Sequence, residues 1–164
     1  MVEACARCAD PKAGNLLEVA NRGEGAPLHL PLDVVVAAKL EPGQETRTVP
    51  ADAIPSDMAG YDIGLLTLDR WQELLTGAKT IVWNGPVGVF EIPPFDDGTT
   101  RVARMIAEET GRGAVSIVGG GDSAAAIARI GMTDRISHVS TGGGASLEFL
   151  EGNELPGVSV LTDK

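Results

Sequence analysis

Three glycine-rich turns constrain the fold of this chain more than any other feature. Each follows a β-rich run, at residues 80–83, 114–118 and 136–140, and each precedes a helical pattern, at residues 99–109, 122–130 and 145–150. Strands that alternate with helices at this spacing predict a parallel sheet with right-handed crossovers. We therefore expect an α/β fold, with a Rossmann-like, doubly wound sheet at the centre of a three-layer αβα arrangement.

The first half of the chain is less regular. Residues 28–37, 46–49 and 61–64 are strand candidates, and Thr67 is expected to be the N-cap of a helix that reaches Thr76. A short helix is expected at 16–21. Cys5 and Cys8 could form a redox or metal pair, but the only histidines are His29 and His138. Two small apolar residues on one helical turn are the favoured interpretation of this pair.

The charge of the chain argues against nucleic acid as a partner. Its formal net charge is −10, whereas nucleic-acid binding needs clustered cations. No apolar run reaches the length of a membrane span and no secretion signal is recognisable, so a cytoplasmic protein without membrane contact is expected. A phosphate site in so acidic a chain would depend mainly on backbone dipoles.

The three turns carry the residues that suggest such a site. In an open parallel sheet all three would lie at the carboxyl edge, where ligands bind and where glycine lets backbone N–H groups face a ligand. Asp122 beside phosphates suggests magnesium, and Ser123 could donate to a phosphate oxygen; the alternative is that Asp122 only caps its helix. The turn at 141–145 could receive negative charge or be only a tight turn.

The first turn, at 84–91, offers contacts for a nucleoside. Asn84 is both donor and acceptor, Pro86 and Val89 could line a base pocket, and Glu91 could accept from ribose hydroxyls. The alternative for Glu91 is a solvated loop residue.

Residues 82–91, 119–124 and 140–148, together with 30–37 and 49–55, resemble the signatures of phosphoglycerate kinase, and the resemblance covers about residues 28–164. That family transfers a phosphoryl group between 1,3-bisphosphoglycerate and ADP with magnesium, and it has one domain for each substrate. The resemblance implies that the adenine lies near Gly60 and Tyr61 and against Pro86 and Val89, with Glu91 on the ribose. It places Asn84 near the phosphates. The implied ligands of the phosphates and magnesium are Gly120, Gly121, Asp122 and Ser123, and the implied contacts of the phosphoryl group in transit are Gly121, Gly142, Gly143 and Gly144.

The resemblance also implies that much of such an enzyme is missing. Residues 1–164 would form a single partial domain, the later part of the nucleotide domain. Lys79, Arg129 and Arg135 are expected at the opposite edge of the sheet from the glycine turns. We therefore expect weak binding of ATP or ADP and no turnover by the chain alone, with the missing N-terminal part as a partner; residues 155–161 would pack against it. The alternative is a non-catalytic module for nucleotide binding or assembly.

Overall fold

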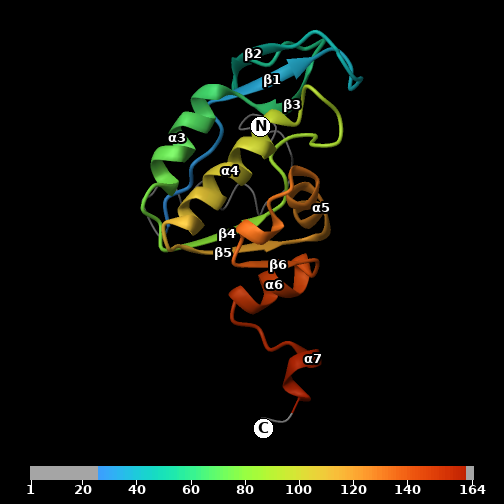
Figure 1. Cartoon of the computed structure of the whole chain (residues 1–164). Coiled ribbons are helices and arrows are strands. Elements are labelled where there is room, and N and C mark those ends of the chain that lie inside the picture. The colour runs from blue at the N-terminus through green and yellow to red at the C-terminus, as the bar shows by residue number, and fades with distance from the viewer. Residues whose placement is uncertain (1–25, 162–164) are drawn as a thin grey trace.

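The computed structural model describes residues 26–161, which form two three-stranded sheets with helices between and below them (Figure 1). The residues around Cys5 and Cys8 and the helix expected at 16–21 lie outside the described part. The strands are β1 Asp33–Ala37, β2 Arg47–Pro50, β3 Ala59–Ile63, β4 Thr80–Asn84, β5 Val115–Gly119 and β6 His138–Ser140. The helices are α3 Leu65–Leu75, α4 Asp97–Gly111, α5 Gly121–Ile130, the 3-10 turn η1 Thr133–Arg135, α6 Gly143–Leu150 and α7 Pro156–Ser159.

The second half of the chain forms the parallel sheet that the strand–turn–helix units predict. Its strand order is β4-β5-β6, and the register pairs Asn84 with Gly119 and Gly119 with Ser140. The carboxyl ends of all three strands therefore lie side by side. The α/β fold class and the parallel sheet are confirmed.

The main core lies between one face of the parallel sheet and helices α3, α4 and α5. Ile81 and Trp83 of β4 point into it and are buried, whereas Val82 between them is 43% exposed on the other face. Helix α4 brings a continuous apolar stripe onto this face, because its buried residues recur at helical spacing. These buried α4 residues include Val102, Ala103, Ile106 and Ala107.

The first half forms an antiparallel sheet that the sequence patterns did not predict. Its order is β2-β1-β3, and it covers a small separate core around Val34, Val36 and Ala51. Only Asp33–Ala37 of the run at 28–37 is strand. In Figure 1 this sheet lies at the far side of α3 and α4 from the parallel sheet.

The prediction that Thr67 is an N-cap is wrong. The N-cap of α3 is Gly64, and Thr67 lies inside the helix with its side chain fully buried. Asp33, at the start of β1, accepts the hydrogen bonds of this helix terminus instead. Its Oδ1 accepts from Thr67 N at 2.9 Å and from Thr67 Oγ1 at 2.6 Å, and its Oδ2 accepts from Leu66 N at 3.2 Å. A carboxylate from another element therefore satisfies the free N–H groups that begin this helix.

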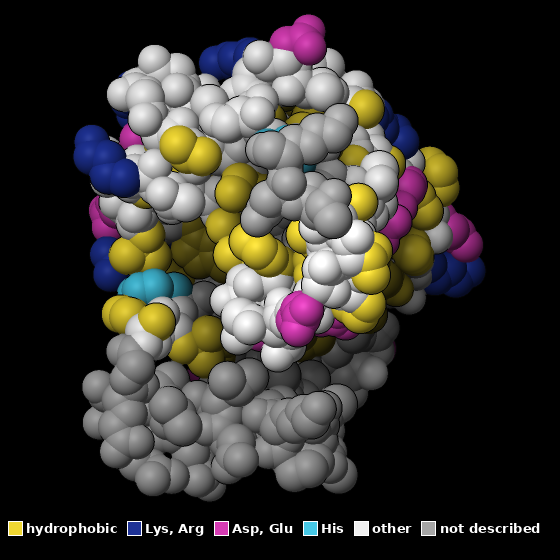
Figure 2. Space-filling view, turned by 90° about the horizontal axis from the view of Figure 1, so that it is seen from below, with side chains coloured by type: hydrophobic (Ala, Val, Ile, Leu, Met, Phe, Trp, Pro, Cys, Tyr) yellow, Lys and Arg dark blue, Asp and Glu magenta, His cyan; other side chains and the backbone are white. Residues whose placement is uncertain are grey.

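Helices α6 and α7 continue away from the rest of the molecule (Figure 1). Figure 2 shows the molecule from this side, where apolar side chains gather on the surface. Val82 and Val115 of the sheet and Phe149 of α6 are among the exposed apolar residues, and Phe149 is 66% exposed. No helix of residues 26–161 is long and apolar enough to cross a bilayer.

Candidate functional site

The three glycine turns converge at the carboxyl edge of the parallel sheet, as the strand pattern predicted. Gly120 N donates to Ser140 O at 3.0 Å, which joins the second turn to the end of β6. A Cβ on Gly143 would lie 3.0 Å from Gly120 Cα, and a Cβ on Gly120 would lie 3.0 Å from Asn84 Oδ1. Asn84, Gly120 and Gly143, one residue from each turn, are thus in close contact.

Glycine is needed at the centre of this contact for two separate reasons. Gly85 and Gly120 have φ of 97° and 99°, a left-handed conformation that side chains with a Cβ rarely adopt. Gly143 has no such φ, but a Cβ at this position would meet the backbone of Gly120, which cannot shift as easily as a flexible side chain. The result is a cluster of backbone groups at the start of α5 and α6, where helix dipoles favour an anion.

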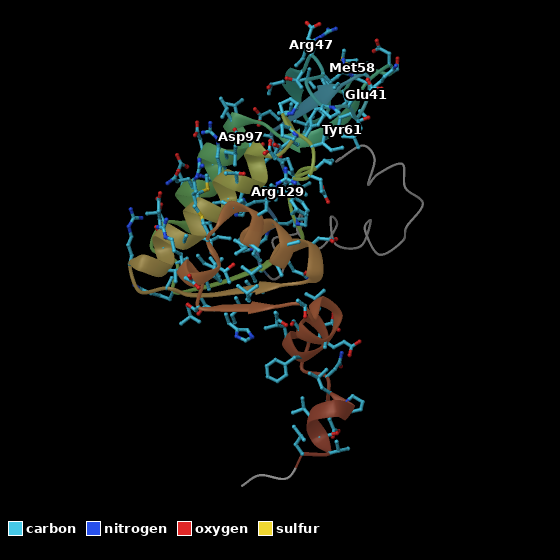
Figure 3. All side chains as sticks on the ribbon, turned by 45° about the vertical axis from the view of Figure 1, so that its right-hand side comes forward. Glu41, Arg47, Met58, Tyr61, Asp97 and Arg129 are labelled. Carbon is cyan, nitrogen blue, oxygen red and sulfur yellow. The ribbon has the colours of Figure 1, made fainter. Side chains whose placement is uncertain are left out.

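A cavity of about 370 Å³ lies beside the first turn. It brings together the residues predicted to contact a base: Gly60, Tyr61, Pro86 and Val89 all line it. Tyr61 extends from β3 (Figure 3), and its ring packs against Phe95 with centroids 5.0 Å apart. Residues from the antiparallel sheet and from the loop after β4 therefore line one cavity.

The loop at 86–89 is held in part by two residues to which the sequence analysis gave no role in the site, Thr99 and Asp62. Val89 N donates to Tyr61 O at 2.9 Å, and Gly88 N donates to Thr99 Oγ1 at 3.2 Å. Asp62 of β3 lies against the loop and is only 4% exposed. An acidic residue within an apolar strand was the one sequence signal that could have identified it.

Burial raises the pKa of the Asp62 carboxyl to about 6, because the charged form loses its hydration. Backbone N–H groups of Gly98 and Ile63 favour the charged form and oppose this shift, whereas Asp96 and Asp97 add to it.

Ser123 is fully buried, and its Oγ accepts from Gly85 N at 2.7 Å. The hydroxyl that was expected to contact phosphate thus connects α5 to the first turn in this structure. Its predicted contact with phosphate stays a prediction.

Asp122 and Glu91 are both exposed, and neither lines the base cavity. Asp122 lies in the first turn of α5, whose N-cap is Gly120 and has no side-chain capping bond. The structure therefore gives no support to a capping role for Asp122. Within residues 26–161 no group of three or more potential metal ligands occurs.

This donor set suits magnesium better than zinc. Mg²⁺ keeps several waters and is often held by one or two carboxylates together with substrate phosphates. One exposed carboxylate at an anion-binding helix terminus fits that pattern, so Asp122 is the residue of this cluster that would hold the ion.

Arginine and lysine are absent from the described residues that line the base cavity and the cavity along Asn84 and Gly142. Lys79 lies at the opposite edge of the sheet beside Glu109, as predicted. The prediction for Arg129 is wrong, since Arg129 lines a cavity of about 240 Å³ with Phe90, Asp96 and Arg104. Arg129 and Ile130 at the end of α5 thus share this cavity with the start of α4, and Figure 3 shows where Arg129 lies.

Comparison with known proteins identifies what this arrangement resembles. The phosphoglycerate kinase family model matches residues 4–153, which extends the match toward the N-terminus beyond residue 28 and leaves out residues 154–164. The phosphoglycerate kinase of Thermosipho africanus is 55% identical over 153 residues, covering 93% of this chain, and that of Mycolicibacterium gilvum is 58% identical over 138 residues, covering 84%. The structure of the enzyme from Coxiella burnetii superposes on 92% of this chain with a TM-score of 0.82 and 44% identity.

The chain spans 38% of the Thermosipho africanus protein, 34% of the Mycolicibacterium gilvum protein and 38% of the Coxiella burnetii chain. The match thus covers little more than a third of each of these longer polypeptides. With a family model over most of its residues and a structural neighbour at 44% identity, the chain belongs to the phosphoglycerate kinase family.

Proposed function

We propose that this chain is the nucleotide-binding part of a phosphoglycerate kinase, which transfers a phosphoryl group between 1,3-bisphosphoglycerate and ADP to give 3-phosphoglycerate and ATP. The observation that carries the proposal is the convergence of three glycine turns beside the base-sized cavity. The turns provide backbone donors for phosphates, and the cavity provides apolar walls for a base.

Within this site different residues would contact the adenine, the ribose and the phosphates of the nucleotide. Gly60, Pro86 and Val89 would contact the adenine, and Glu91, exposed at the end of the first turn, would accept from the ribose hydroxyls. Asn84 would lie near the phosphates. The remaining phosphate ligands would be Gly120, Gly121, Asp122 and Ser123.

Gly121, Gly142, Gly143 and Gly144 would face the phosphoryl group in transit. Backbone N–H groups at the starts of α5 and α6 would stabilise the charge on that group without having to reorganise. Mg²⁺, held by Asp122 and the nucleotide, would neutralise charge on the phosphates when it is bound.

The chain alone would bind nucleotide but would not turn over. No lysine or arginine of residues 26–161 lines the base cavity or the cavity along Asn84 and Gly142, and a missing transition-state cation costs orders of magnitude in rate. The cations and the surface for phosphoglycerate would come from the missing N-terminal part, as a separate chain or as the rest of a longer one.

Calorimetric titration of the chain with Mg-ADP tests the binding step. We expect saturable one-to-one binding that weakens on removal of magnesium and in Asp122→Asn. Glu148→Gln, an exposed carboxyl of α6, is a matched control that should bind as the unaltered chain does. No detectable heat or shift at millimolar Mg-ADP would refute nucleotide binding.

A coupled assay tests the catalytic step. The chain alone should form no ATP from 1,3-bisphosphoglycerate, whereas the chain mixed with the missing N-terminal part of a relative should form it. Robust turnover by the purified chain alone would contradict our account of the missing cations.

A non-catalytic nucleotide-binding or assembly module is the second candidate. The same absence of lining cations favours it, because simple binding needs less charge neutralisation than phosphoryl transfer. Mg-ADP binding without any turnover in the mixture would select this alternative.

A further inference from the structure

Asp62 is a buried carboxylate that joins elements far apart in the sequence. It lies near the end of β3 and is 4% exposed. Its Oδ1 accepts from Ile63 N at 2.8 Å, and its Oδ2 accepts from Gly98 N, in the first turn of α4, at 2.7 Å. Both oxygens are thus occupied by backbone donors, one from the strand and one from the helix.

Two glycines leave the space that this carboxylate fills. A Cβ on Gly88 would lie 2.2 Å from Asp62 Oδ1, and a Cβ on Gly98 would lie 2.1 Å from the same atom. Neither glycine has a φ in the left-handed region, so the backbone conformation does not require glycine at either position. A Cβ on Gly88 would also lie 2.6 Å from Phe95 O, and a Cβ on Gly98 would also lie 2.9 Å from Ile63 Cγ1. Contact with Asp62 is thus the closest of the contacts that require glycine at these two sites.

Gly88 belongs to the loop that lines the base cavity, and Asp62 lines that cavity as well. Two hydrogen bonds hold the loop at this contact. Val89 N donates to Tyr61 O, and Gly88 N donates to Thr99 Oγ1. A neutral side chain of the same size would fill the space without the cost of burying a charge. It would not accept from both backbone amides, which is what the ionised carboxylate does.

We propose that Asp62 is a positioning residue of the base cavity, whose carboxylate fixes the loop at 86–89 against β3 and the first turn of α4. This rests on the proposed function, since the loop is assigned to nucleotide binding. Asp62 itself need not touch the nucleotide.

The first test compares two matched variants of the full chain. Asp62→Asn keeps the shape but places an amide N–H₂ against one of the two backbone donors. Asp33→Asn is the control, because Asp33 is also 4% exposed and also accepts at a helix start, but at α3. In calorimetric titration with Mg-ADP, Asp62→Asn should raise the Kd about tenfold, or about 1.4 kcal/mol, while Asp33→Asn stays within about twofold. Equal effects of the two variants on Kd would overturn the proposal.

The second test needs no nucleotide, so it remains decisive if Mg-ADP binding itself fails. Amide resonances of the unaltered chain are followed from about pH 4.5 to 8. Burial holds the pKa of Asp62 near 6, and the other charged groups that face it are Asp96 and Asp97 at the start of α4. The amides of Ile63 and Gly98, which donate to the carboxylate, should shift with a midpoint near 6.

The loop amides decide the outcome. If Asp62 positions the loop, the amides of Gly88 and Val89 shift with the same midpoint, and all four shifts disappear in Asp62→Asn. If Ile63 and Gly98 titrate while Gly88 and Val89 do not, the carboxylate serves only the helix start, and the proposal is wrong. Because this readout uses the unaltered chain, it holds even if Asp62→Asn does not fold.

Discussion

The junction between β1 and α3 offers the sharpest test of what stabilises this chain. Asp33 accepts from Thr67 N, Thr67 Oγ1 and Leu66 N, and Thr67 Oγ1 in turn accepts from Leu32 N at 2.9 Å and Asp33 N at 3.1 Å. Both side chains are almost fully buried. Removing the carboxylate in Asp33→Ala leaves the buried Thr67 N and the part-buried Leu66 N without an acceptor. The Thr67 hydroxyl can still donate to Asp33 O at 3.1 Å.

The expected cost follows from that count. A lost helix cap costs about 1 kcal/mol, and each buried donor left without a partner costs about 1–3 kcal/mol. With one fully buried donor lost, we therefore expect Asp33→Ala to lower the free energy of unfolding by about 2–4 kcal/mol, a large part of the ~5–15 kcal/mol typical of a domain. Asp33→Asn keeps one acceptor oxygen and should cost about half as much.

Urea unfolding followed by tryptophan fluorescence measures this, because Trp71 and Trp83 both pack in the main core. The midpoint should fall at constant m-value. Thr67→Val provides the second arm of a double-mutant cycle with Asp33→Asn, and residues in one network should couple by about 0.5–3 kcal/mol. If Asp33→Ala changes stability by less than about 0.5 kcal/mol, or if the two variants are additive, the network is not what joins β1 to α3.

Three further predictions concern the site. The pKa of Asp62 is raised from 3.8 to about 6 in the folded state, so between these values the folded chain binds a proton that the unfolded chain has lost. The contribution of Asp62 to the free energy of unfolding should therefore fall by up to about 3 kcal/mol as the pH rises from 4 to 6. Asp62→Asn should flatten that part of the pH profile of urea unfolding. Gly143→Ala should weaken Mg-ADP binding at least about tenfold in calorimetry, because its Cβ would meet backbone at 3.0 Å. Gly111→Ala, at the end of α4 with open space around it and no left-handed φ, should bind normally. Ser123→Ala should cost about 1–2 kcal/mol in urea unfolding, because a backbone amide loses its acceptor.

The parallel half of the fold was predictable because its signals are local. A β-rich run, a glycine turn and a helical stripe follow one another within about 15 to 30 residues, and the carboxyl ends of parallel strands must share an edge. The contact between Asn84, Gly120 and Gly143 follows from those two facts. The helix boundaries differ by only a few residues, as in α4, which begins at Asp97 rather than at 99.

The antiparallel half could not be predicted in the same way, because its determinants are distant in the sequence. Asp33 and Thr67 are separated by 34 residues, and Asp62 and Gly98 by 36. A buried carboxylate is recognisable only when its donors are known, since an isolated Asp in a strand pattern could equally lie on an exposed face. Thr67 shows the consequence: its position near a helix start suggested a cap, whereas the actual acceptor comes from another strand.

The negative net charge of the chain is compatible with an anion site because that site is formed by backbone groups. A nucleotide with its phosphates is strongly anionic, and a chain of net charge −10 would repel it if the site relied on its own side chains. The glycine turns avoid this, because backbone N–H groups and helix dipoles provide local positive potential without adding a cation. Such dipoles can hold an anion in its ground state, but phosphoryl transfer also develops charge on the moving group, and that charge needs mobile or full positive charges. No Lys or Arg of residues 26–161 lines the base cavity or the cavity along Asn84 and Gly142. On this ground we propose that the site binds a nucleotide on its own but needs cations from elsewhere to transfer the phosphoryl group.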